Sequence, residues 1–329
     1  MDSFTQIVLG ASVAYLTLPK QMGKHRLWIG ALFGTIPDLD VWIARVFYSD
    51  PLTEVMIHRG FSHSIVFFVL LSVFSAYFLR KIVIFHHISF KTLFYSLFVI
   101  LFTHSLLDIF TTWGTQLFWP FADKLSLHSI FVIDPLYSLP LTFGLWMSIK
   151  KTNQTYNRIG LISSTAYLIS TLLIQKYIEI KVNDKFTNQK VVSMVAKPTA
   201  MNTILWNVIV ETDEKFYLTQ VHIFDKSIEP FLSFDKNHEY LKEVSLPLKK
   251  QLKNITQGQY TVEKSSQGLV VNDMRFGLLK NEESDHQFAF SYLLNEENGI
   301  WNVKEQPKKN RDGKELLKKI SIRIMNPLK

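Results

Sequence analysis

Two pairs of polar side chains stand inside otherwise apolar stretches of the first half of the chain. Asp38 and Asp40 are two residues apart and follow Pro37, which interrupts a helix. His104 and Asp108 are four residues apart, so on a helix they share one face and can reach one ion. A charged side chain inside a membrane-spanning helix costs about 2.5–3.5 kcal/mol on insertion scales, so each of these groups needs a reason to be there. Together, imidazole and carboxylate groups indicate a divalent metal site.

A loop between these two pairs supplies further groups of the same kind. His58 and His63 lie in it on either side of Arg59, which is placed to bind a phosphate or a carboxylate. Asp134 is a further acid in a later apolar run and, like Arg59 and Gln6, a second-tier candidate. The candidate metal ligands are Asp38, Asp40, His58, His63, His104 and Asp108. One of the two carboxylates of the first pair is then left to act as a general base.

The chain contains no cysteine, which excludes disulfides, thiolate zinc sites and a cysteine nucleophile. Zn²⁺ is therefore the expected metal for a hydrolase with these ligands, and Mn²⁺ is an alternative. A bound Zn²⁺ lowers the pKa of its water toward about 7, which supplies hydroxide at neutral pH.

The elements that carry these groups are apolar runs at roughly 7–18, 27–48, 65–79, 92–111, 129–149 and 159–178. A spanning helix needs about 20 residues to cross about 30 Å of hydrocarbon. Four of the runs reach this length and a fifth nearly does, whereas the first can equally be a half-inserted or re-entrant helix. We therefore expect an α-helical integral membrane domain of five or six spans.

Loop charge predicts the orientation of these spans. Nine Lys and Arg residues lie in the loops 20–26, 80–91 and 150–158, against two in the loops 49–64 and 112–128. The positive-inside rule places the first set in the cytoplasm. The other two loops, and everything after residue 178, are then expected on the outer face of the bacterial cytoplasmic (inner) membrane.

With this orientation, the polar groups fall at one depth. At 1.5 Å per residue, Asp40 lies about 20 Å from the cytoplasmic start of its span, and His104 and Asp108 lie about 18 and 24 Å from theirs. Asp134 is about 8 Å from the outer end of its own span. All of them therefore lie in the outer third of the bilayer, which predicts one shared site.

The second half of the chain has a different composition. Residues 1–178 contain 13 Lys and Arg and 8 Asp and Glu, whereas residues 179–329 contain 23 and 20. Short β-branched or aromatic runs at 203–210, 216–224, 269–276 and 287–294 are bounded by turn-forming residues. We expect a helical membrane domain with the metal site at 1–180 and a small β-rich domain at 181–329. The net charge of +8 is spread over both halves, so no nucleic-acid partner is expected.

Four ordered motifs resemble a bacterial and archaeal family of membrane-bound, predicted metal-dependent hydrolases of the LexA-regulated inner-membrane type. The motifs are the start Met1–Gln6 with Gly10, the segment Gly34–Asp40, the segment His58–Ser64, and Thr103–Asp108 followed by Trp113-Gly114 and Pro120-Phe121. The resemblance covers about residues 1–180. The family is distantly similar to zinc phospholipase C and single-strand nucleases, which implies phosphoester hydrolysis. Many relatives have His where this chain has Gln6, which implies that one metal position is lost or weakened.

These observations favour a membrane-embedded, metal-dependent hydrolase of a phosphoester in a lipid or lipid-linked substrate, with membrane lipids as its surroundings. Two alternatives stay open. A proton- or metal-linked transporter would also bury acids and histidines in the membrane, and a non-catalytic anchor or scaffold would use the membrane half only to hold the β-rich domain. The sequence leaves open the substrate, the number of metals, the oligomeric state and the role of residues 181–329.

Overall fold

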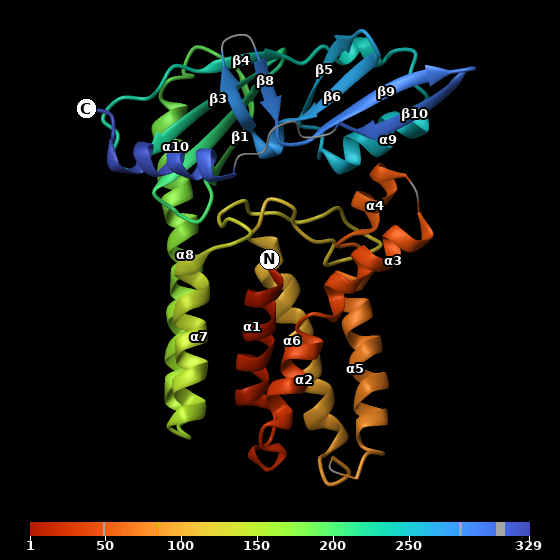
Figure 1. Cartoon of the computed structure of the whole chain (residues 1–329), viewed down its shortest axis with the longest axis vertical. Coiled ribbons are helices and arrows are strands. Elements are labelled where there is room, and N and C mark those ends of the chain that lie inside the picture. The colour runs from red at the N-terminus through yellow and green to blue at the C-terminus, as the bar shows by residue number, and fades with distance from the viewer. Residues whose placement is uncertain (49, 84, 283–284, 307–312) are drawn as a thin grey trace. The chain divides into compact units, whose positions relative to one another are not determined.

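The chain is described from a computed structural model that covers residues 1–48, 50–83, 85–282, 285–306 and 313–329. It divides into two compact units. The first unit consists of Met1–Ile43 and Ile57–Leu173, and the second of Ala44–Met56 and Ile174–Lys329. The helices precede the strands along the chain, as Figure 1 shows from red to blue.

The first part of the chain is mainly helical. Its α-helices are α1 (Ser3–Thr17), α2 (His25–Phe33), α3 (Asp40–Phe47), α4 (Pro51–Ile57), α5 (Ile65–Leu79), α6 (Phe90–Ile109), α7 (Pro135–Lys150) and α8 (Gln154–Asn183). Three 3₁₀ turns lie between them, namely η1 (Lys20–Met22), η2 (Ile36–Leu39) and η3 (Phe61–His63). The segment 49–64, expected from its sequence to be a loop, thus holds α4 and η3, while residue 49 lies outside the described residues.

Among the described residues, α6 and α8 are long and apolar enough to cross a membrane. The number rises to four if each of two bent helix pairs counts as one span. These pairs are His25–Phe33 with Ile36–Phe47, bent by 46°, and Leu52–His63 with Ile65–Leu79, bent by 56°. The expected helical region with apolar spans is confirmed, while the expected number of five or six spans is not.

Both bends follow from the local sequence. Helix α2 ends at Gly34, and Pro37 lies in the first turn of η2, where its missing N–H breaks the helical hydrogen-bond ladder. The second bend follows Gly60, and Ser64 then caps α5 by accepting a hydrogen bond from the Phe67 N–H. Each break places metal-binding residue types at the end of an apolar helix.

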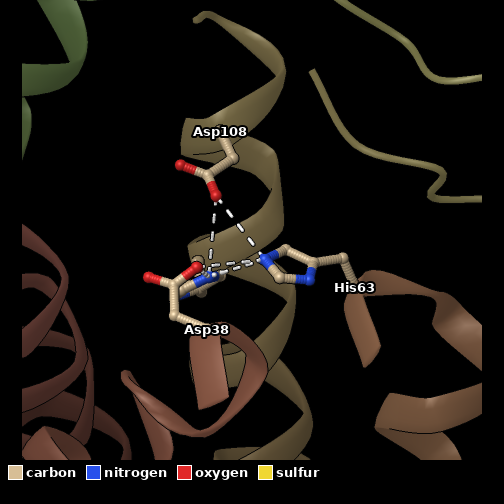
Figure 2. Close-up of side chains that lie close together, drawn as sticks. Asp38, His63 and Asp108 are labelled. Atoms are coloured by element: carbon tan, nitrogen blue, oxygen red, sulfur yellow. Dashed lines mark hydrogen bonds and ion pairs between the residues drawn. The ribbon is translucent and has the colours of Figure 1, made fainter. Parts of the chain in front are cut away.

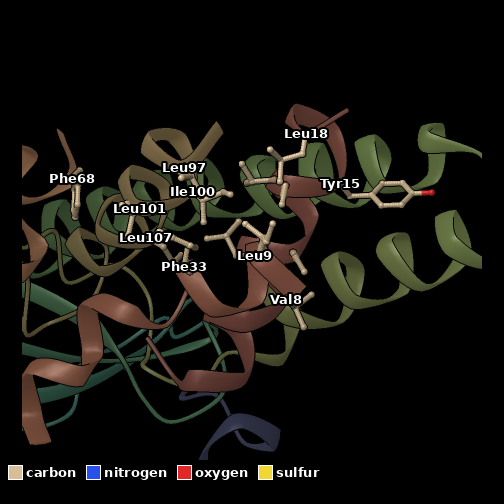
Figure 3. Packing of buried hydrophobic residues seen from close by; sticks show 14 of the residues in the cluster. Val8, Leu9, Tyr15, Leu18, Phe33, Phe68, Leu97, Ile100, Leu101 and Leu107 are labelled. Atoms are coloured by element: carbon tan, nitrogen blue, oxygen red, sulfur yellow. The ribbon is translucent and has the colours of Figure 1, made fainter. Parts of the chain in front are cut away.

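Close packing of α1 against α2 fixes the position of the first bend. A Cβ atom added at Gly10 would overlap the carbonyl oxygen of Gly30, and one added at Gly34 would lie 2.6 Å from the carbonyl oxygen of Gln6. The two helices therefore approach each other through glycine backbone, as small residues allow in membrane helices. Around this contact, buried side chains of α1, α2, α5 and α6 form one apolar core (Figure 3).

The second unit is rich in antiparallel sheet. Its strands are β1 (Val191–Pro198), β2 (Leu205–Thr212), β3 (Lys215–His222), β4 (Leu232–Asp235), β5 (Tyr260–Ser265), β6 (Gly268–Asp273), β7 (Leu278–Glu282), β8 (Asp285–Phe288), β9 (Ser291–Glu297) and β10 (Ile300–Glu305). They form sheets of order β1-β2-β3-β4 and β10-β9-β6-β5, together with the hairpin β7-β8. Helices α9 (Leu246–Ile255) and α10 (Gly313–Met325) and the 3₁₀ turns η4 (His238–Leu241) and η5 (Met274–Phe276) complete the unit. The expected β-rich region is thereby confirmed.

Candidate metal centre

Four side chains from three separate segments of the first unit converge on one point. Asp38 comes from η2, His63 from the end of η3, and His104 and Asp108 from one face of α6. One ligand atom from each lies within 4.8 Å of all the others. Asp38, His63 and Asp108 point toward one another in Figure 2. His63, His104 and Asp108 are fully buried, and Asp38 is partly exposed.

The separations in this cluster suit a shared ion better than direct hydrogen bonds. The two Nε2 atoms of His63 and His104 are 3.2 Å apart. The Asp38 Oδ1 atom lies 3.3 and 3.6 Å from them, and the Asp108 Oδ2 atom 3.6 and 3.7 Å. Ligand atoms at about 2.0–2.1 Å from a tetrahedral Zn²⁺ are separated by about 3.3 Å. The five distances are therefore close to the edges of one tetrahedron.

The hydrogen bonds of His104 fix which of its nitrogens faces the cluster. Its Nδ1 lies 2.7 Å from the carbonyl oxygen of Gly34, which can only accept, so the proton of the neutral ring is on Nδ1. The Nε2 lone pair is then free to bind a metal. Because Gly34 is held by the α1–α2 glycine contact, that packing also orients this ring.

His63 is oriented in the same way by different groups. The Ser62 hydroxyl donates to Asp40 Oδ2 at 2.5 Å, so its oxygen accepts from His63 Nδ1 at 3.0 Å. Asp40 Oδ2 itself lies 3.4 Å from the same nitrogen. The His63 proton is therefore also on Nδ1, and its Nε2 faces the cluster. Hydrogen bonds of this kind, made by the nitrogen that does not bind the metal, accompany most histidine ligands.

Asp108 presents one oxygen to the cluster and uses the other for positioning. Its Oδ1 accepts from the Gln6 amide at 3.1 Å and also contacts the amino nitrogen of Met1. Its Oδ2 is buried and has no hydrogen-bond partner among the described residues. The Arg59 guanidinium lies 3.4 Å from this oxygen and compensates part of its charge, and a metal ion at the cluster would supply the missing partner.

Asp40 and His58, both candidate ligands from the sequence, lie beside this four-residue cluster rather than in it. Asp40 accepts from His58 Nδ1 at 2.7 Å and from the backbone N–H of Arg59 at 3.0 Å. Both of its oxygens are thus engaged in holding the loop that carries His63. Asp40 is two residues after Asp38, but the helix α3 starts between them and turns the two carboxylates to different neighbours.

The second-tier residues also have defined positions. Arg59 is buried, donates to Thr111 Oγ1 at 3.0 Å and has one guanidinium nitrogen 3.4 Å from Asp108 Oδ2, so its charge lies beside the cluster. Gln6 is buried and holds Asp108 through its amide nitrogen. Asp134 lies outside the cluster: it caps α7 by accepting from the backbone N–H groups of Leu136 and Tyr137.

Two positioning groups were not identified from the sequence. The Ser62 hydroxyl could have been suspected from its place beside His63, because serine commonly accepts from a neighbouring imidazole. The Gly34 carbonyl is a backbone group, and no sequence signal could have identified it.

Comparison with known proteins places the first half of the chain in a family. Residues 1–178 match the family described as YdjM inner membrane protein. An uncharacterized protein of Bacillus subtilis (strain 168), YfhP, is 27% identical over 231 residues, which cover 66% of this chain and 67% of YfhP. No solved structure gives a significant match.

Proposed function

The chain belongs to the YdjM inner membrane protein family, and from this premise we propose that it is a membrane-embedded, metal-dependent hydrolase of phosphoesters. The observation that carries the proposal is the pair of Nε2 atoms of His63 and His104, which face each other at 3.2 Å while both Nδ1 atoms are engaged elsewhere. Two neutral rings in this arrangement would direct lone pairs at each other. A cation bound by both rings would remove that repulsion, and carboxylate oxygens of Asp108 and Asp38 lie within reach of the same point.

Zn²⁺ fits this ligand set best, and Mn²⁺ is the alternative. Two imidazoles and two carboxylates without a thiolate suit a redox-silent ion of borderline softness. When bound, such an ion supplies a Lewis acid that polarises a phosphoryl oxygen and acidifies a coordinated water. Gln6 lies next to Asp108. Many members of the hydrolase family that the sequence resembles have His at this position, so its replacement by Gln favours a single ion.

The neighbouring residues have distinct roles in this proposal. Asp38 is the partly exposed member of the cluster, so substrate and water would reach the site on its side. In this proposal His63, His104 and Asp108 would hold the ion and leave its fourth position to water, and Asp38 would accept the proton of that water. Arg59 lies beside Asp108 and provides positive charge for the phosphate oxygens. Asp40 keeps His63 in the required orientation and is a positioning residue, with His58 held on its other oxygen.

The depth of the site supports a lipid or lipid-linked substrate. Asp108 is the second-last residue of the spanning helix α6, and Asp38 and His63 lie at the breaks of the two bent helix pairs. The cluster is thus at one end of the spans, where lipid headgroups lie.

We further propose five or six spans in total, counting the short apolar helices α1 and α7. The site and the carboxy-terminal region then lie on the outer face, because the basic loops belong in the cytoplasm.

The test combines metal analysis with an activity panel on the full chain purified in detergent. Wild-type protein should contain about one Zn²⁺ or Mn²⁺ per chain by elemental mass spectrometry, and should release product from at least one of a set of phospholipids, lysophospholipids and polyprenyl phosphates. His104→Ala should lose both metal and activity, because it removes one ligand. His128→Ala is the matched control, since His128 contacts Ser126 and belongs to no part of the cluster.

Two results of this test would contradict different parts of the proposal. Unchanged metal content in His104→Ala would defeat the metal site. Metal that depends on His104, with no turnover on any phosphoester, would favour a metal-linked transporter or a non-catalytic member of the family.

A further inference from the structure

An apolar groove runs along helix α5 next to the start of α6. It is open to the surface and has a volume of about 820 Å³. The side chains that line it are Phe61, Phe67, Leu70, Leu71, Val73, Phe74, Tyr77 and Phe90. None of them is charged, and Tyr77 alone carries a polar atom. Helices α5 and α6 pack against each other.

One end of the groove lies at η3, the turn that also carries a member of the metal cluster. Phe61 is the first residue of η3, and His63, a member of the metal cluster, is its last. The Phe61 ring packs edge-on against Phe67 of α5, at 5.4 Å between ring centroids, and against Trp119, at 5.0 Å. One short turn therefore holds both a proposed metal ligand and the end wall of the groove.

The groove continues toward the opposite end of the helices. Phe67 and Tyr77 are ten residues apart on α5, which corresponds to about 15 Å. Phe90 is fourteen residues before His104 on α6, or about 21 Å from the metal centre along the helix. The groove is thus long and uniformly apolar, and it starts where the proposed phosphate site lies.

We propose that this groove binds one acyl chain of a phospholipid whose phosphate reaches the His63–His104 centre. The occupant is argued from two features: an anionic head suits the proposed metal and Arg59, and a flexible hydrocarbon chain suits a wall of Phe, Leu and Val. The reaction of this lipid and the position of its phosphate rest on the proposed function, whereas the binding of its acyl chain in the groove does not. The groove then determines which lipids are substrates.

The test uses substitutions that fill the groove, with a control on the same helix. Leu70→Trp fills the groove, and Leu71→Trp is a second variant that fills it from another side. Val69→Trp adds the same ring to an exposed α5 position that does not line the groove. Palmitoyl-oleoyl phosphatidylglycerol is titrated onto each full-length protein in detergent, and the bound fraction is measured by native mass spectrometry. We expect about tenfold weaker binding in the two filling variants and unchanged binding in Val69→Trp.

Binding and hydrolysis separate this inference from the proposed function. If the wild type hydrolyses no phosphoester but the filling variants alone lose phosphatidylglycerol, the groove assignment stands and the proposed function fails. If all three variants bind like the wild type, or all three lose binding equally, the groove is an ordinary lipid-facing surface and the inference is wrong. Stronger retention of a polyprenyl phosphate than of phosphatidylglycerol, or a stable dimer that the filling variants disrupt, would assign the groove to another occupant.

Discussion

His63 and His104 face each other through their Nε2 atoms at 3.2 Å, although they come from segments 41 residues apart. Each ring donates its Nδ1 proton to a different part of the unit, His104 to the Gly34 carbonyl and His63 to the Ser62 hydroxyl. Two independent sets of contacts thus turn two lone pairs toward one point. The two rings are thereby oriented as two histidine ligands of one metal ion would be.

The hydrogen bonds of Asp40 give the first prediction. Asp40→Ala should reduce metal affinity about 10–100-fold without abolishing binding, as is usual when the partner that orients a histidine ligand is removed. Asp40 engages the Ser62 hydroxyl and the Arg59 N–H, so its loss frees the turn that carries His63. Zn²⁺ titration of the metal-stripped protein against a competing chelator measures the affinity.

Asp134→Ala is the matched control for Asp40. It also removes a buried carboxylate, but one that caps α7, so it should cost about 1 kcal/mol of stability and leave metal affinity unchanged. If Asp40→Ala abolished binding as completely as His104→Ala, Asp40 would have to be a ligand itself, contrary to its place outside the cluster.

The glycine contact between α1 and α2 gives the second prediction. Gly10→Ala should lower both the melting temperature and the metal content, because its methyl group would overlap the Gly30 carbonyl and separate the two helices. The movement would displace the Gly34 carbonyl that orients His104. Overpacking of this kind costs about 1–3 kcal/mol. Thermal unfolding and metal analysis in detergent measure both effects.

Gly313→Ala tests whether this effect is specific to the helix contact. Gly313 begins α10, and a Cβ atom there would meet no described atom within 4 Å. Its replacement should leave stability and metal content as in the wild type. A Gly10→Ala protein with wild-type metal content would mean that His104 does not depend on the α1–α2 packing.

The sequence predicted the parts of the candidate site that regular geometry determines. His104 and Asp108 share a helix face because they are four residues apart, and the structure places both in the cluster. Pro37 predicted an interruption before Asp38, and a 3₁₀ turn is present there. These inferences depend on the helical repeat and on the chemistry of proline, both of which act locally.

Other features depend on contacts that no local rule supplies. The rotation between Asp38 and Asp40 is set by an irregular break, where the helical repeat does not apply. Asp134 was grouped with the site because of its depth, yet it directly precedes Pro135, and an acid followed by proline is typical of a helix N-terminus. That local signal predicts a cap, and the structure has one.

In the second unit, the expected strand at 203–210 corresponds to β2 at Leu205–Thr212. Its boundaries differ because the side chain of Asn202 ties the backbone of residues 204 and 205 into a turn.

The charge of the loops gives the third prediction, which concerns topology. Single cysteines at Ser126 and Ser265 should react with a membrane-impermeant thiol reagent in intact cells, and one at Thr152 should react only after the cells are opened. The chain has no native cysteine, so each signal reports one position. Reaction of the Thr152 variant in intact cells, with the other two protected, would reverse the proposed orientation.

The fourth prediction concerns pH and a buried amine in the second unit. Lys197 of β1 is buried, and its Nζ has no hydrogen-bond partner among the described residues. Burial lowers the pKa of Lys197 from 10.5 to about 7, while the nearby Asp273 raises it by a smaller amount and Arg275 lowers it further. Between these values the unfolded chain binds one proton more than the folded chain, so stability rises with pH across this window, by at most about 1.4 kcal/mol per pH unit. Below about pH 7 the full cost of burying the charge remains.

Lys197→Met should therefore raise the melting temperature of the full-length protein in detergent most at about pH 6 and least at about pH 10, where the native amine is neutral. The comparison is Lys190→Met, which removes an exposed lysine that pairs with Asp213 at the surface and should change stability little at either pH. Methionine is similar to lysine in length and has no charge to bury, so the two variants separate charge burial from the loss of a surface ion pair. An equal gain for Lys197→Met at both pH values would show that the amine is not buried as a charge at low pH. The absence of any gain would show that it finds a polar partner in solution.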